Sequence, residues 1–216
     1  LISICTANLY SQSSFTGDNT GVTIDDDHEV ISEVTVNNLS GYINTDFVID
    51  NVKVNLNHTY NSDLALSLVA PDGTNLDLSE YNGGSTDDYI NTVFKDGGAD
   101  ISQANGPFSD TYEPEEGTFS FTFDDVQING TWKLKIFDSS SFSGSGTFNS
   151  FEITFGSGPG CVSPTNLTVS GIYQNKVDLS ADLSVAKHSD YEWVIMNSGD
   201  TPSVSNAVKT GTAVIK

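Results

Sequence analysis

The sequence contains no arginine, and its 216 residues include 8 lysines against 29 acidic side chains, giving a formal net charge of −21. Proteins that bind nucleic acid neutralise phosphates and read base edges largely with clustered arginine and lysine. Anionic membrane surfaces attract the same basic residues. The composition therefore argues against a nucleic-acid partner and against binding to an anionic membrane.

Cysteine and long apolar runs are also scarce. Cys5 and Cys161 are too few for a disulfide framework, and no Cys/His spacing is typical of a zinc site. No run of 18 or more apolar residues occurs, so we expect no membrane span. The opening LISICTANLYSQ runs from apolar to small to polar residues, so residues 1–25 read either as a signal-peptide remnant with a lead-in or as a lead-in alone.

Period-two alternation of apolar residues recurs along the chain, and helical spacing does not, which predicts an all-β fold. The alternating sets, each expected on one strand face, are Val52, Val54, Leu56 and His58; Leu64, Leu66 and Leu68; Phe119, Phe121 and Phe123; Trp132, Leu134, Ile136 and Asp138; and Phe151, Ile153 and Phe155. Turn signals such as Pro71-Asp72-Gly73 and Asn129-Gly130 separate them. Strands spaced in this way predict two antiparallel sheets packed face to face, a sandwich or jelly roll.

A glycine-rich stretch divides the chain. Residues 157–161 lie in GSGPGC and predict a linker between a first domain, 26–156, and a second unit, 162–216. The second unit offers three further strands, which are too few to close a sandwich. We therefore interpret it as an incomplete second β-sandwich module.

Histidine is the residue type to test for catalysis, and the chain has His28, His58 and His188. None of them lies in a nucleophile-elbow sequence or beside a recognisable serine partner. His58 ends an inward-facing strand set, so we expect it to be buried and hydrogen-bonded to a loop rather than to act as a base or a ligand. Asp138 also ends an inward-facing set, so it must be hydrogen-bonded or metal-bound, and we expect it to tie a loop. No catalytic residue is predicted.

Acidic residues cluster between the strands, for example in KDGGAD at 95–100. Calcium prefers six to eight oxygen ligands, and carboxylates beside a glycine-rich turn supply them readily. No EF-hand or nonapeptide calcium repeat is present, so a solvated acidic loop is the alternative interpretation.

Six short motifs occur in an order that resembles a known family. They are His58-Thr-Tyr60, Ser62-Asp63-Leu64, Pro71-Asp72-Gly73-Thr74, Asn91-Thr92-Val93-Phe94, Gly130-Thr131-Trp132-Lys-Leu134 and Gly146-Thr147-Phe148. Over residues 26–156 the chain resembles the P domain, or Homo B domain, of kexin-like proprotein convertases and secreted bacterial proteases. The resemblance implies a jelly-roll β-sandwich without catalytic residues that supports an attached subtilisin-like, serine-type endopeptidase.

The resemblance also implies structural calcium, with Asp63, Asp87, Asp96 and Asp100 as the matching acids. Family members commonly have adjacent acids after the Val-Phe pair, whereas this chain has Lys95 before Asp96. From Cys161 onward the chain resembles the opening of a fibronectin type III-like module, with Ala181 where that family usually has tryptophan.

These observations predict a non-catalytic accessory domain of a secreted or cell-surface multidomain protein. Its partner would be a protease catalytic domain in the same polypeptide. The alternative is an extracellular module that binds polysaccharide or protein through loop aromatics. The candidates for that role are Tyr81, Tyr89, Phe108, Tyr112 and Phe142.

Overall fold

The computed structural model describes residues 12–140 and 144–158 with their side chains, and only the backbone of strands at 2–4, 165–172, 177–182, 190–195 and 209–214. The chain divides into two compact units. Tyr10–Gly158 forms the first, which we call the sandwich unit, and the second combines Leu1–Leu9 with Pro159–Lys216. The boundary falls within the stretch 157–161 that the sequence marks as a linker.

Strands dominate the described part of the sandwich unit. They are β2 (Ser13–Thr16), β3 (Val22–Asp25), β4 (His28–Val36), β5 (Phe47–His58), β6 (Leu64–Val69), β7 (Asn75–Glu80), β8 (Tyr89–Asp100), β9 (Thr111–Glu113), β10 (Gly130–Asp138) and β11 (Ser145–Ser157). Short helical turns connect some of them, namely the 3-10 turns Asn61–Asp63 and Ile101–Gln103 and the α-helical turn α1, Phe119–Thr122. The expected lead-in of residues 1–25 thus contains two strands of this unit.

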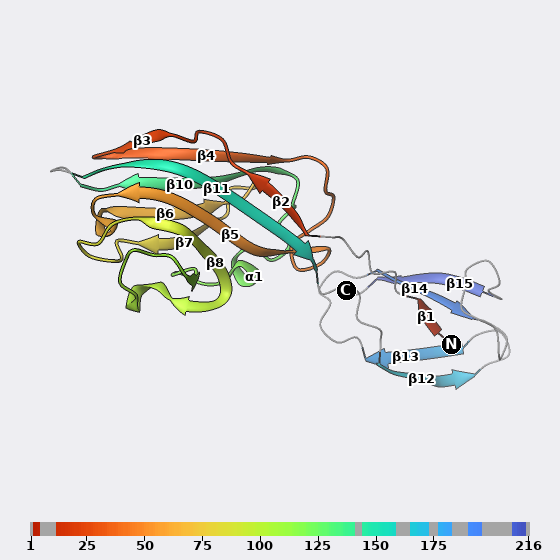
Figure 1. The fold of residues 1–216 in the computed structure, drawn as a ribbon. Coiled ribbons are helices and arrows are strands. Elements are labelled where there is room, and N and C mark those ends of the chain that lie inside the picture. The colour runs from red at the N-terminus through yellow and green to blue at the C-terminus, as the bar shows by residue number, and fades with distance from the viewer. Residues whose placement is uncertain are drawn as a thin grey trace. The chain divides into compact units, whose positions relative to one another are not determined.

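The strands form two sheets, which Figure 1 shows as two layers. One sheet has the order β4-β10-β6-β7, and the other has the order β2-β11-β5-β8-β9, with β3 also paired to β11. Neighbouring strands are antiparallel except β8 and β9, which run parallel. The prediction of an all-β sandwich is confirmed.

The hydrophobic core lies between the two sheets, and alternate residues of each strand supply it. The inward sets of β5, β6, β10 and β11 are buried as the alternation predicted. The Pro71-Asp72-Gly73 signal forms the β6–β7 turn, in which the Gly73 amide donates to the Ala70 carbonyl over 3.0 Å. Strand β6 and the turn that follows it therefore match the sequence pattern.

The segment Phe119–Phe123 is not the strand that its alternation predicted. It forms the single turn α1, capped by Thr118, whose Oγ1 accepts a hydrogen bond from the Phe121 amide at 3.1 Å. Residues four apart share one face of a helix as well as one face of a strand, so Phe119 and Phe123 are both buried. Phe121, two residues from each, points outward in the helical turn and is 84% exposed.

The stretch KDGGAD, expected as a loop, lies within β8. Its pairing with β9 is interrupted there, because Phe94 and Ala99 both pair with Tyr112 and the residues between them bulge out. Gly98 makes this possible, since a Cβ at this position would lie 2.3 Å from the carbonyl carbon of Tyr112. The bulge carries Asp96 out of the strand register.

The second unit contains strands β1 (Ile2–Ile4), β12 (Thr165–Ile172), β13 (Val177–Asp182), β14 (Asp190–Ile195) and β15 (Lys209–Val214). β1, β14 and β15 form one antiparallel sheet, and β12 and β13 form another. Its resemblance to a fibronectin type III-like module stays a prediction. Among the residues that the structure describes, no helix has the length and apolar composition needed to cross a membrane.

Candidate functional site

A buried histidine–aspartate pair joins the two sheets at one end of the sandwich unit. His58 is the last residue of β5, and Asp138 is the last residue of β10 in the opposite sheet. His58 Nε2 lies 3.0 Å from Asp138 Oδ2, and both side chains are fully buried. The same inward alternation that buries the hydrophobic residues of each strand therefore brings these two polar side chains together.

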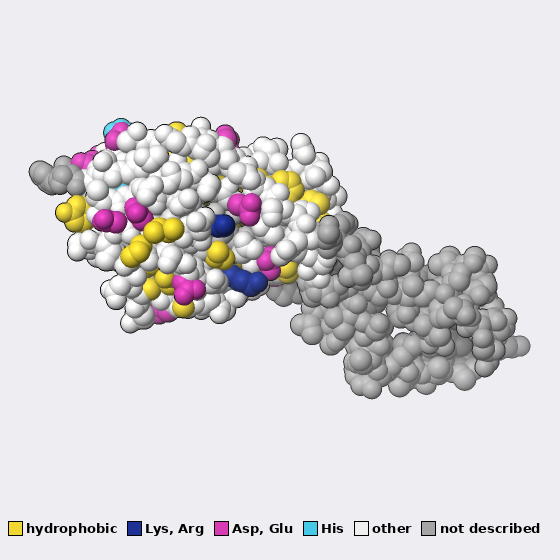
Figure 2. Space-filling model, viewed as in Figure 1, with side chains coloured by type: hydrophobic (Ala, Val, Ile, Leu, Met, Phe, Trp, Pro, Cys, Tyr) yellow, Lys and Arg dark blue, Asp and Glu magenta, His cyan; other side chains and the backbone are white. Residues whose placement is uncertain are grey.

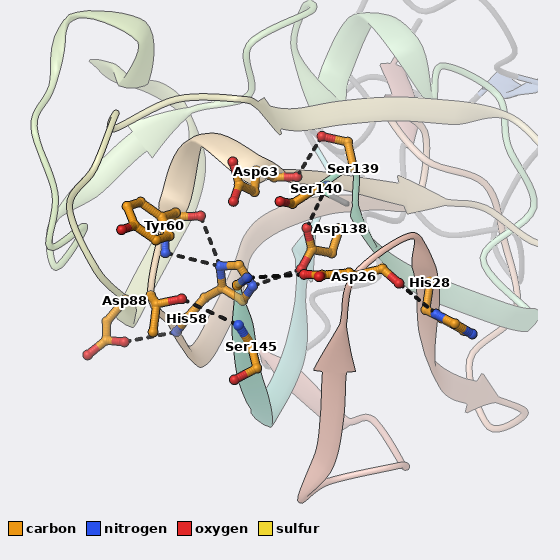
Figure 3. Close-up of polar contacts among 12 residues, drawn as sticks. Asp26, His28, His58, Tyr60, Asp63, Asp88, Asp138, Ser139, Ser140 and Ser145 are labelled. Atoms are coloured by element: carbon orange, nitrogen blue, oxygen red, sulfur yellow. Dashed lines mark hydrogen bonds and ion pairs between the residues drawn. The ribbon is translucent and has the colours of Figure 1, made fainter. Parts of the chain in front are cut away.

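The remaining polar atoms of the pair also have partners, as Figure 3 shows. His58 Nδ1 lies 2.9 Å from the carbonyl oxygen of Tyr60, and the amide of Ser140 donates to Asp138 Oδ1 over 2.9 Å. The amide of Tyr60 also lies 3.3 Å from His58 Nδ1, so both ring nitrogens have hydrogen-bond partners. A buried pair that is satisfied in this way is costly to break, because either remaining partner would stay buried and unpaired.

Three neighbouring acids tie further segments to this end of the sandwich. Asp88 Oδ1 accepts from the His58 amide at 3.0 Å, and Asp26 Oδ1 accepts from the Gly144 amide at 3.1 Å. The backbone carbonyl of Asp63 accepts from the Ser139 amide at 2.9 Å. We call the two paired side chains with these three acids the closing cluster, because together they fasten the chain segments at the end of β5 and β10.

Glycine lets the start of β11 approach the histidine ring closely. A Cβ at Gly146 would lie 2.7 Å from His58 Cδ2 and 2.1 Å from the Asn57 carbonyl oxygen. A Cβ at Gly144 would lie 3.0 Å from His58 Cε1. Gly144 and Gly146 therefore allow close packing against His58.

The pair lacks the arrangement that nucleophilic catalysis requires. In a catalytic triad one ring nitrogen contacts the carboxylate and the other contacts the nucleophile. Here the second nitrogen of His58 faces the Tyr60 carbonyl, and neither side chain of the pair is accessible to a substrate. The arrangement fixes structure, as expected for His58 and Asp138 from the sequence.

The family comparison covers the buried pair of this cluster. Residues 50–155 match the model of the proprotein convertase P-domain, from within β5 to within β11. The chain carries a P-domain. The matched stretch includes both members of the buried pair, so the pair belongs to the P-domain itself.

Two curated relatives are longer proteins. The chain is 29% identical over 126 residues to leupeptin-inactivating enzyme 1 of Streptomyces exfoliatus, covering 58% of this chain and 22% of the relative. It is 34% identical over 105 residues to the transglutaminase-activating metalloprotease of Streptomyces mobaraensis, covering 48% of this chain and 10% of the relative. The chain thus spans about a fifth and a tenth of the lengths of these proteins.

Solved structures show more distant similarity. The serine protease of Aeromonas sobria aligns with a TM-score of 0.44 at 16% identity, over 69% of this chain and 27% of the protease. The structure of that organism's serine protease in complex with the chaperone aligns with a TM-score of 0.37 at 18% identity, over 69% of this chain and 28% of the aligned one.

The four acids predicted to bind calcium do not form a common ligand group in the P-domain. Both carboxylate oxygens of Asp96 accept from backbone amides of α1, and Asp100 Oδ1 accepts from the amide and hydroxyl of Ser102. Asp63 contributes its backbone carbonyl to the closing cluster, and Asp87 is exposed. No group of three or more His, Cys, Asp or Glu side chains suited to a metal occurs within the described ranges 12–140 and 144–158.

Most of the aromatics proposed for ligand stacking are part of the core. Tyr89 and Phe108 are fully buried, with ring centroids 4.9 Å apart, and Tyr112 stacks edge-on against Phe108. Burial raises the pKa of the Tyr89 hydroxyl, which forms a 2.9 Å hydrogen bond with Ser79 Oγ. Tyr81 is exposed, and Phe142 lies outside the described residues. Because Tyr89, Phe108 and Tyr112 are packed in the core, the observed packing gives no support to polysaccharide binding by this set.

Two features of the site were not predicted: the contact between His58 and Asp138, and the capping of α1 by Asp96. The sequence held a signal for the first feature, because each of the two residues occupies the last inward-facing position of its strand, directly after the apolar ones. The second had none, because the bulge that moves Asp96 depends on pairing between β8 and β9.

Proposed function

We propose that this P-domain is a non-catalytic accessory domain of a secreted peptidase and that it stabilises the catalytic part of the same polypeptide. The P-domain match over residues 50–155 carries the proposal. The closing cluster supports it, since His58 and Asp138 are buried and their polar atoms are engaged in structural contacts. The names of the two Streptomyces relatives, an inactivating enzyme and a metalloprotease, agree with this setting.

The physical basis of the proposal is linkage. A domain that binds only the folded form of its neighbour stabilises that form, and tethering gives it a high effective concentration. Stabilisation of the catalytic part should therefore depend on the sandwich unit being folded and covalently attached.

The test uses the full polypeptide that joins this chain to its proposed catalytic part, which we call the peptidase polypeptide. It compares this polypeptide with a variant lacking residues 10–158. Active enzyme would first be quantified by active-site titration, and the half-life of activity then measured at rising temperature. We expect a shorter half-life without the P-domain and an unchanged kcat/KM per active site at low temperature. Equal half-lives would overturn the stabilising role. A deletion of residues 159–216 is the matched control for the loss of a domain.

The class of the catalytic part is a separate element of the proposal. We propose a subtilisin-like serine endopeptidase, as the family resemblance implies. Inactivation by a serine-reactive fluorophosphonate would support that class. Inactivation by a zinc chelator alone would instead assign a metallopeptidase, the class that the name of the Streptomyces mobaraensis relative states.

Calcium also stays a proposal. The acids predicted as ligands do not share a site, so any structural calcium would use carbonyl oxygens with one or two carboxylates. The test is the melting temperature of the chain in calcium and in chelator. A higher melting temperature in calcium would support calcium binding, and equal melting temperatures would show that calcium does not stabilise the fold.

A further inference from the structure

Phe121 is the most exposed large hydrophobic side chain of the described part of the chain. It is 84% exposed, whereas the next, Tyr42, is 47% exposed. Single exposed apolar residues are common on protein surfaces and need no explanation by themselves. The surroundings of Phe121 are what distinguish it.

The backbone that carries Phe121 is held in place on both sides. Asp96 accepts from the amides of Phe119 and Ser120 at 2.7 and 3.0 Å, and Asn44 donates to the Ser120 carbonyl. On either side of Phe121 in the sequence, Phe119 and Phe123 are anchored in the core, the latter edge-on against Trp132 with ring centroids 5.3 Å apart. A side chain held on such a fixed turn loses little backbone entropy on binding.

A hollow of about 220 Å³ lies beside this turn. Ser120, next to Phe121 in the chain, forms part of its wall, as does Asp96, which caps the turn. The remaining lining residues are Asn44, Val48, Ile49, Asp50 and Lys95. The surface therefore combines a projecting aromatic ring, a residue type enriched at the centre of protein–protein interfaces, with a recess whose charged residues suit the polar rim of an interface.

We propose that Phe121 and this hollow form the surface by which the P-domain docks onto the catalytic part of its own polypeptide. The inference rests on the proposed function and adds to it the face that makes the contact. The two curated relatives extend far beyond the P-domain-containing segment, since the chain covers 22% and 10% of them, so a large neighbouring body is present in such proteins. The partner surface should offer an apolar pocket for the ring and basic groups around that pocket, to match the acidic surface of the sandwich unit.

Charge argues against a second copy of this chain as the occupant. The sandwich unit carries 24 acidic residues and four lysines, a net charge of −20. Figure 2 shows acidic side chains spread over the face in view, with lysine at few points. Two such bodies repel each other, whereas a neighbour with basic groups around its pocket would be attracted.

The first experiment is hydroxyl-radical footprinting of Phe121 in the 216-residue chain and in the peptidase polypeptide. Tyr81, exposed at the end of β7, is the internal control. We expect Phe121 to be oxidised several-fold more slowly in the longer polypeptide and Tyr81 to be unchanged. Equal rates for Phe121 would overturn the proposal. Protection already present in the 216-residue chain would also overturn it, since a second copy or residues 159–216 would then be the occupant.

The second experiment introduces Phe121→Ser into the peptidase polypeptide, with Tyr81→Ser as the matched control. We expect Phe121→Ser to shorten the half-life of peptidase activity several-fold at high temperature, while the melting temperature of the 216-residue chain carrying the same change stays the same. An unchanged half-life would overturn the docking surface. If deletion of residues 10–158 still shortened the half-life, the proposed function would stand and only the assigned face would be wrong.

Discussion

The closing cluster and the α1 turn differ in which kind of side chain they bury. At the closing cluster the polar His58 and Asp138 are fully buried, and at α1 the apolar Phe121 is 84% exposed. In both regions the alternating sequence pattern predicted that every second residue would face inward. The difference shows that burial here follows backbone geometry rather than the polarity of the side chain.

The partners of each residue explain why both arrangements are stable. His58 and Asp138 contact each other, and each also contacts a backbone group, the Tyr60 carbonyl and the Ser140 amide respectively. Their burial therefore leaves no hydrogen bond unmade. Phe121 is exposed because Asp96 and Thr118 stabilise the turn that directs it outward. The predictions below test this contrast from the largest expected effect to the smallest.

Substitutions in α1 and at its C-terminal neighbour Phe123 should distinguish the buried rings from the exposed one. Phe123→Ala removes a fully buried ring that packs on Trp132 and should lower the free energy of unfolding by about 4 kcal/mol. Phe121→Ala should change it by less than about 0.5 kcal/mol, because that ring is solvated. Urea denaturation of the 216-residue chain measures both. Equal effects would mean that the two rings are equally buried in solution.

Removing one member of the buried pair should have the next largest effect. Asp138→Ala leaves His58 buried without its partner and should cost about 3 kcal/mol of unfolding free energy. A cycle with His58→Ala and the double variant should give a coupling of about 1 to 3 kcal/mol. Denaturant melts of the four proteins supply the values, and a coupling near zero would show that the side chains do not interact.

Asp96 and Asp87 should differ although both were predicted as calcium ligands. Asp96→Ala removes the acceptor for two amides at the start of α1 and should cost about 1 to 2 kcal/mol in chelator. Asp87→Ala, an exposed position, should stay within about 0.5 kcal/mol. Thermal melts in chelator and in calcium check this. An equal loss for both variants that appears only in calcium would favour a shared metal site over capping.

Asp50 should contribute the smallest effect, and one that depends on pH. Burial alone would raise its pKa, but hydrogen bonds from Lys95, Asn51 and Gln12 outweigh burial and lower the pKa from the ordinary 3.8. A lowered folded-state pKa gives stability that is complete above the unfolded pKa and is lost as the pH falls through the folded value. Because the Asp50 side chain is 27% exposed and its partner Lys95 is 48% exposed, water screens the pair, and Asp50→Asn should cost under about 1 kcal/mol at neutral pH.

Denaturant melts of Asp50→Asn across the acid range would show that pH dependence, with Asp87→Asn as the control. The stability difference from the unaltered chain should shrink to nothing on acidification. A difference that grows as the pH falls would contradict the assigned hydrogen bonds.

The sequence predicted the sandwich because alternation reports burial strand by strand. Val52, Val54 and Leu56 illustrate this, since each is fully buried as expected. The same pattern buried Phe119 and Phe123 as expected but failed for Phe121 and for the element type, because a spacing of four residues fits one face of a helix as well as a strand. Local pattern alone cannot distinguish the two when the segment is a single turn.

The site was predictable only in part. Burial of His58 and Asp138 followed from their place at the end of inward-facing strands, and the tie to a loop is confirmed by the Tyr60 and Ser140 contacts. Their mutual contact required the order of strands in both sheets, which alternation does not specify. The role of Asp96 required the bulge in β8, which arises from pairing with a strand that begins 15 residues further along the chain than Asp96.

The most direct test of the account places Asp138→Ala in the peptidase polypeptide and measures both kcat/KM at low temperature and the half-life of activity on heating. If the buried pair supports a stabilising domain, the half-life should shorten while kcat/KM per active site stays unchanged. A loss of turnover at low temperature with an unaltered half-life would assign the pair to catalysis and contradict the account.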